Sequence, residues 1–113
     1  MDRDLYSQDD WEFVNSILLA IQGALFGEVI PSLRQIVLKW KPGDKKFCVY
    51  FFHHGEITAN IEDHYSRIMT EVDGDFCFLT DFEVIRCDYP KTLPNEGYDV
   101  TAYRRKEPFV DPI

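Results

Sequence analysis

The sequence predicts an α+β fold in which a four-stranded, mainly antiparallel sheet carries two helices on one face. Three observations predict it: two segments with apolar residues at three- and four-residue spacing, several short runs of β-branched and aromatic residues, and turn residues between them. In chain order these elements give αββαββ. Because there is no internal repeat and no linker rich in Gly or Ser, residues 1–113 are expected to form one domain.

The first helix is predicted within "SQDDWEFVNSILLAIQGALFG". Ser7 can cap its start, and Gly27 is expected to end it. The spacing of the large apolar residues draws one stripe along this helix, formed by Trp11, Val14, Leu18, Ile21 and Leu25.

Two strands are predicted to follow as a hairpin, "LRQIVLKW" and "FCVYFFHH", joined by a turn through Pro42, Gly43 and Asp44. Both faces of the second strand are apolar, which favours a central position in the sheet. Alternation places Phe47, Val49 and Phe51 on one face, and Cys48, Tyr50 and Phe52 on the other.

The second helix is predicted within "ITANIEDHYSRIMTEVDGD", with Thr58 or Asn60 as its cap and Gly74 at its end. Its buried stripe comprises Ile61, Tyr65, Ile68, Met69 and Val72. Two further strands are predicted in "FEVIRCDY" and "YDVTAYRR", joined through "PKTLPNEG".

Acidic residues dominate the charge of the chain, with 20 Asp and Glu against 12 Lys and Arg, a net charge of −8. Residues 56–88 alone hold nine acids and two bases, which gives −7. Such a surface repels phosphates, so direct nucleic-acid binding is not expected. A basic protein is the partner that this charge favours, and simple solubilisation is the alternative interpretation.

The cysteines and the apolar runs point to a reduced protein of the cytoplasm. Cys48, Cys77 and Cys87 are odd in number and form no CxxC pair, so neither a disulfide framework nor a zinc site is expected. No apolar run is long enough for a membrane span, and the acidic N-terminal segment lacks the pattern of a signal peptide. No membrane partner and no cofactor are predicted.

The stretch "CVYFFHHGE" raises the question of a catalytic or metal site. His53 and His54 are adjacent on a strand and therefore point to opposite faces, which is unsuited to holding one metal. A metal site would need one of them to converge with His64 and a carboxylate. Acid–base chemistry would need Glu56, Glu62 or Asp63 close to His53. We instead interpret both strand histidines as rim residues, and we predict no catalytic or metal residue.

The aromatic residues of the strands form a further candidate surface: Tyr50, Phe52, Tyr89, Tyr98 and Tyr103. With helices on one face only, aromatic residues on the other face are expected to be semi-exposed. They would then serve as a protein-binding hot spot, or else pack in the sheet or at a homodimer interface. Four charged residues near the strand ends are interpreted as cross-strand ion pairs: Arg86, Asp88, Arg104 and Arg105.

Four segments of the chain resemble immunity proteins of contact-dependent growth-inhibition and polymorphic-toxin systems. They are "LLAIQGAL…PSLRQIVLKW", "VYFFHHGEIT", "EVIRCDYPKTLP" and "VTAYRRKEPF", and the resemblance extends from about Ile17 to Phe109. A weaker resemblance exists to antitoxins of secreted nuclease toxins of Gram-positive bacteria. Such proteins bind the C-terminal domain of a toxin in the producing cell and block its active site or exclude its substrate.

The resemblance therefore implies a non-enzymatic inhibitor whose partner is a cognate toxin domain, expected to be basic and a nuclease. It does not indicate the contact residues, but the charge pattern does. The predicted toxin-binding residues are the acids of the 56–88 segment: Glu56, Glu62, Asp63, Glu71, Asp73 and Asp75. The alternatives are a small adaptor, a homodimeric binding protein, or the metal-binding enzyme considered above.

Overall fold

The computed structural model describes residues 8–41, 46–74, 80–94 and 97–107. These residues form two helices and four strands in the order αββαββ, which confirms the α+β class. The elements are α1 (Gln8–Ala24), β1 (Leu33–Lys41), β2 (Lys46–His53), α2 (Ala59–Asp73), β3 (Thr80–Arg86) and β4 (Val100–Arg104). The predicted cap Ser7 and the predicted turn residues Pro42, Gly43 and Asp44 lie outside the described residues.

The four strands form one sheet in the order β3-β2-β1-β4. β1 runs antiparallel to β2 and β4, whereas β2 and β3 are parallel, so the sheet is mixed and the mainly antiparallel description was wrong. The physical reason is the length of α2. Its 15 residues span about 22 Å, close to the length of β2, and so return the chain to the end where β2 began. A strand that follows such a crossover pairs in parallel.

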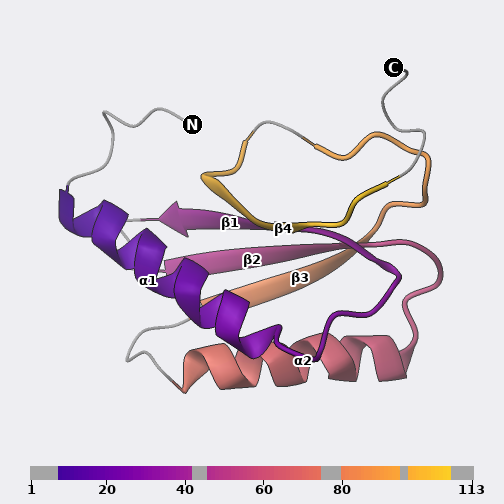
Figure 1. The fold of residues 1–113 in the computed structure, drawn as a ribbon, viewed down its shortest axis with the longest axis horizontal. Coiled ribbons are helices and arrows are strands. Elements are labelled where there is room, and N and C mark those ends of the chain that lie inside the picture. Colours follow the sequence, from indigo (N-terminus) through magenta and orange to yellow (C-terminus); the bar gives the residue numbers. More distant parts are fainter. Residues whose placement is uncertain (1–7, 42–45, 75–79, 95–96, 108–113) are drawn as a thin grey trace.

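Both helices cover the same face of the sheet (Figure 1). Phe47, Val49 and Phe51 of β2 point into this helix-covered core, as alternation predicted. The predicted stripe of α2 is confirmed as well, because four of its five residues are buried and Ile61 is half-buried. On α1 the buried residues are Val14, Ile17, Ile21 and Ala24, with Trp11 and Leu18 at the margin.

The start of α2 is fixed by local hydrogen bonds. The Thr58 side chain accepts a hydrogen bond from the backbone N–H of Ile61 at 3.3 Å, so of the two predicted caps, Thr58 and Asn60, it is Thr58 that caps the helix, and Gly74 lies at the other end. Just before the helix, Gly55 has φ +93°. Its N–H donates to Oδ1 of Asp88 at 2.8 Å, which ties the turn after β2 to the end of β3.

The other face of the sheet is covered by residues that follow β3. Cys87 and Leu93 pack with Val37 and Phe52 in a second buried cluster. Tyr50 and Tyr98 lie half-buried at its margin, with ring centroids 5.2 Å apart. The expectation of semi-exposed aromatics on this face is therefore wrong for Phe52, which is 4% exposed.

A buried ion pair anchors the chain after β4. A register shift between Leu33 and Gln35 places Arg34 outside the regular β1 ladder. Nε and Nη2 of Arg34 donate to the two carboxylate oxygens of Glu107 at 2.6 and 2.8 Å, and Nη1 donates to the carbonyl oxygen of Cys87 at 2.8 Å. The hydrogen bonds from Arg34 to the carboxylate lower the pKa of Glu107. Breaking such a buried pair costs about 3–5 kcal/mol, so it holds residues 105–107 against β1.

Within the described ranges, neither helix is both long enough and apolar enough to cross a membrane. The thiols of Cys48 and Cys87 are free and buried, and Cys77 lies outside the described residues.

Candidate functional site

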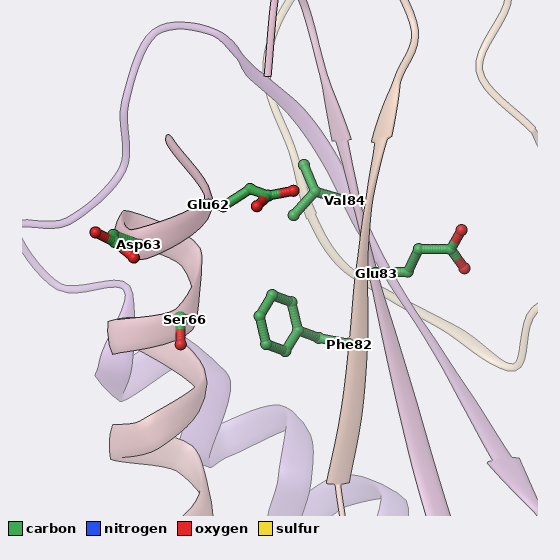
Figure 2. A pocket seen from close by; sticks show the side chains of 6 residues that line it. All are labelled: Glu62, Asp63, Ser66, Phe82, Glu83 and Val84. Carbon is green, nitrogen blue, oxygen red and sulfur yellow. The ribbon is translucent and has the colours of Figure 1, made fainter. Parts of the chain in front are cut away.

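A groove of about 440 Å³ lies between α2 and the edge strand β3 (Figure 2). Glu62, Asp63 and Ser66 line it from the helix. From the strand, the side chains of Phe82 and Val84 point toward the helix, while that of Glu83 points away from it (Figure 2). The helix side of the groove therefore carries carboxylates and the strand side carries apolar residues. The side chain of Phe82 is 38% exposed.

The helical period explains why acids collect on this side of α2. Glu62, Ser66 and Asp73 are four and seven residues apart, so they lie on one side of the helix. Burial raises the pKa of the Asp73 carboxyl, and the negative charge of Asp81 at the start of β3 raises it further. Asp73 thus extends the row of acids on this side of α2 toward the start of β3, where Asp81 lies near it.

The structure separates the predicted toxin-binding acids into groups. Glu62 and Asp63 line the groove, and Asp73 lies on the same side of α2. Glu71 is nine residues from Glu62, about two and a half turns, so it lies on the opposite side of the buried stripe.

The two remaining predicted acids lie away from the groove wall. Glu56 is exposed in the segment before α2, where its charge acts on Arg86. Asp75 lies outside the described residues. Phe82 has no sequence signal of its own, because its exposure depends on β3 being an edge strand beside α2.

His53 is buried, so its interpretation as a rim residue was wrong. It is 2% exposed, because β2 is central and the imidazole lies on the helix-covered face. Its Nδ1 is 2.7 Å from the hydroxyl oxygen of Tyr65. Burial lowers the pKa of His53, the nearby charge of His54 lowers it further, and burial raises the pKa of Tyr65.

The other two histidines have separate partners. Nδ1 of His54 accepts a hydrogen bond from the backbone N–H of Tyr89 at 2.9 Å. Nε2 of His64 lies 2.6 Å from the carbonyl oxygen of Glu28, on the side of α2 that faces the end of α1. Among the residues that the structure describes, no three or more His, Cys, Asp or Glu side chains are grouped in a way that could hold a metal ion.

The basic residues singled out in the sequence pair locally rather than across strands. Arg86 contacts Asp88, two residues on, with Nε 3.1 Å from Oδ1. Arg105 pairs with Glu107 at 2.8 Å, and Arg104 is exposed on β4. The guanidinium of Arg34 also lies over the ring of Tyr89, with its carbon 5.7 Å from the ring centroid.

An α+β domain with an acidic groove beside a sheet edge resembles a protein-binding module. The comparison with protein families specifies which kind. The sequence model of the MafI2 immunity protein family matches residues 14–107, and the chain belongs to this family. None of the curated proteins compared with the chain matches it.

Membership in this family confirms the resemblance to immunity proteins of polymorphic-toxin systems. The role of the protein is to neutralise a toxin, and its partner is a cognate toxin.

Proposed function

We propose that the protein neutralises a basic toxin domain, a nuclease, by binding it across the groove between α2 and β3. The observation that carries this proposal is the groove itself, which Glu62 and Asp63 line from α2 and a partly exposed Phe82 lines from β3. A partly exposed aromatic residue suits the centre of a protein interface, where apolar contact provides affinity, and the carboxylates beside it suit the polar rim, where charge provides orientation.

A nuclease cleft offers the complementary surface. It binds phosphates through Lys and Arg side chains, and these can form charge-assisted hydrogen bonds with carboxylates instead. An acidic inhibitor in that position excludes the nucleic acid both by volume and by charge. In this proposal the protein acts in the cytoplasm of the producing cell, before the toxin meets a substrate there.

The first experiment identifies the partner. The C-terminal domain encoded by the open reading frame immediately upstream is expressed with and without this protein, and growth and co-purification are followed. Relief of toxicity together with a tight complex supports the proposal. Cleavage of RNA or DNA by the purified toxin domain, blocked by a stoichiometric amount of this protein, tests the nuclease assignment.

The second experiment locates the interface. The groove variant Glu62→Lys/Asp63→Lys is compared with Glu12→Lys/Glu71→Lys, which changes the net charge equally but at exposed positions outside the groove. We expect the groove variant to lower the association rate about tenfold or more at low salt, and the control to change it about twofold. Equal effects of the two variants would show that the toxin binds elsewhere.

A further inference from the structure

Within the part of the chain that the structure describes, one edge of the sheet has no further strand paired to it. β3 is the outer strand in the order β3-β2-β1-β4, and among the described residues its only sheet partner is β2. The backbone N–H of Cys87 donates to the carbonyl oxygen of His53 at 2.8 Å, on the β2 side. Because backbone groups alternate along a strand, the N–H and C=O groups of Phe82, Val84 and Arg86 point to the outer side.

Acidic side chains lie along both faces of this edge. Asp81 and Glu83 are exposed on the face away from the helices, and Glu62 and Asp63 flank the helix-covered face. Asp81 forms an ion pair with Lys46, but the Asp81 side chain remains 62% exposed. Charged side chains at a sheet edge disfavour pairing with a like-charged strand.

The negative charge along β3 determines which kind of strand could pair with it. A second copy of this chain paired through β3 would bring its own acids against the same acids, at a cost in free energy. An added strand sends alternate side chains to both faces. A strand with Lys or Arg on both faces would therefore find carboxylates on each, while an apolar residue could pack on Phe82.

We infer that β3 accepts an extended basic segment of the cognate toxin as a fifth strand of the sheet. The inference rests on the proposed function, since it specifies how the toxin occupies the groove. Main-chain hydrogen bonds to Phe82, Val84 and Arg86 would provide affinity and fix the register. The flanking acids would provide the preference for a basic segment.

Amide hydrogen exchange followed by NMR tests the inference directly. In the free protein the amides of Asp81, Glu83 and Ile85 face β2 and serve as internal references. On binding of the toxin domain we expect the amides of Phe82 and Val84 to exchange about a hundredfold more slowly. A complex in which these two amides exchange as in the free protein would overturn the inference.

A matched pair of variants tests the same edge by affinity. Arg86→Pro removes an outward N–H, whereas Arg86→Ala keeps it, and both remove the ion pair with Asp88. We expect toxin to bind the Pro variant about tenfold more weakly than the Ala variant. Equal affinities of the two, with the fold of each confirmed by circular dichroism, would count against strand addition.

The outcomes separate this inference from the proposed function. Loss of binding in the groove variant, with no new protection at Phe82 and Val84, would leave the groove as the interface but remove the fifth strand. An undiminished complex in the groove variant would remove the proposed interface itself.

Discussion

At the level of single residues, His53 is a side chain of a type common in active sites that here is a buried, hydrogen-bonded part of the core. Its imidazole is enclosed beneath α2, beside the Tyr65 hydroxyl. A neutral histidine with one satisfied nitrogen is a tolerable core residue, whereas a charged one in the same place is costly. The position therefore makes the stability of the fold depend on pH.

The sign of this dependence follows from the pKa of His53, which burial lowers below its ordinary value. The unfolded chain takes up the proton at a pH where the folded protein does not. The stabilising contribution of neutral His53 is thus complete above about pH 6.5 and is lost as the pH falls below it. One proton accounts for at most about 1.4 kcal/mol per pH unit.

His53→Asn removes the titrating group and keeps an oxygen that can reach the Tyr65 hydroxyl. We expect the free energy of unfolding in urea to fall more steeply between pH 7.5 and pH 5.0 in the natural protein than in this variant. Parallel pH dependences would show that His53 does not contribute. An NMR titration of the imidazole in the folded protein provides an independent check on the direction of the shift.

At the level of the helices and strands, Gly55 provides the backbone conformation of the turn between β2 and α2. Its φ of +93° is costly for any residue with a Cβ, yet beyond its two chain neighbours no described atom lies within 4 Å of where a Cβ would be placed. Gly55→Ala therefore tests the backbone alone, and we expect it to lower the free energy of unfolding by about 1–2 kcal/mol.

Gly23 provides a matched control of opposite sign. It lies near the end of α1, and a Cβ there would also meet no described atom within 4 Å beyond its chain neighbours and the adjacent helix backbone, but its φ is not in the left-handed region. Gly23→Ala should raise the free energy of unfolding by about 0.5–1 kcal/mol through helix propensity. Urea unfolding of both variants checks the pair. A loss at both positions would mean that side-chain volume, rather than φ, sets the cost.

The same elements show what the sequence could and could not predict. The apolar stripe of α2 and the alternation along β2 depend on local periods, so both helices and the central strand were predicted correctly. The parallel pairing of β3 depends on the direction in which α2 returns across the sheet, which no local pattern records. The site shows the same division: the acids and the helical spacing of Glu62 and Glu71 are local patterns, but which side of α2 faces β3 depends on packing.

At the scale of the whole molecule, the charge is polarised across the sheet. The α2 and β3 side carries Glu62, Asp63 and Asp81, whereas Arg104 on β4 and Lys106 just after it are exposed at the opposite edge. Three strand spacings separate the two edges, about 14 Å. That distance exceeds the Debye length of about 8 Å at physiological salt, so a partner at one edge senses little of the other.

This separation predicts that location, not net charge, controls toxin association. Arg104→Glu/Lys106→Glu makes the protein more negative by four charges, as many as Glu62→Lys/Asp63→Lys removes. If net charge governed the encounter, the first variant should bind a basic toxin faster. We expect its association rate at physiological salt to stay within about twofold of the natural protein, because the added charges lie beyond the screening distance from the groove. Stopped-flow measurement at several salt concentrations decides between these outcomes, and an acceleration as large as the slowing in the groove variant would mean that the whole field guides the toxin.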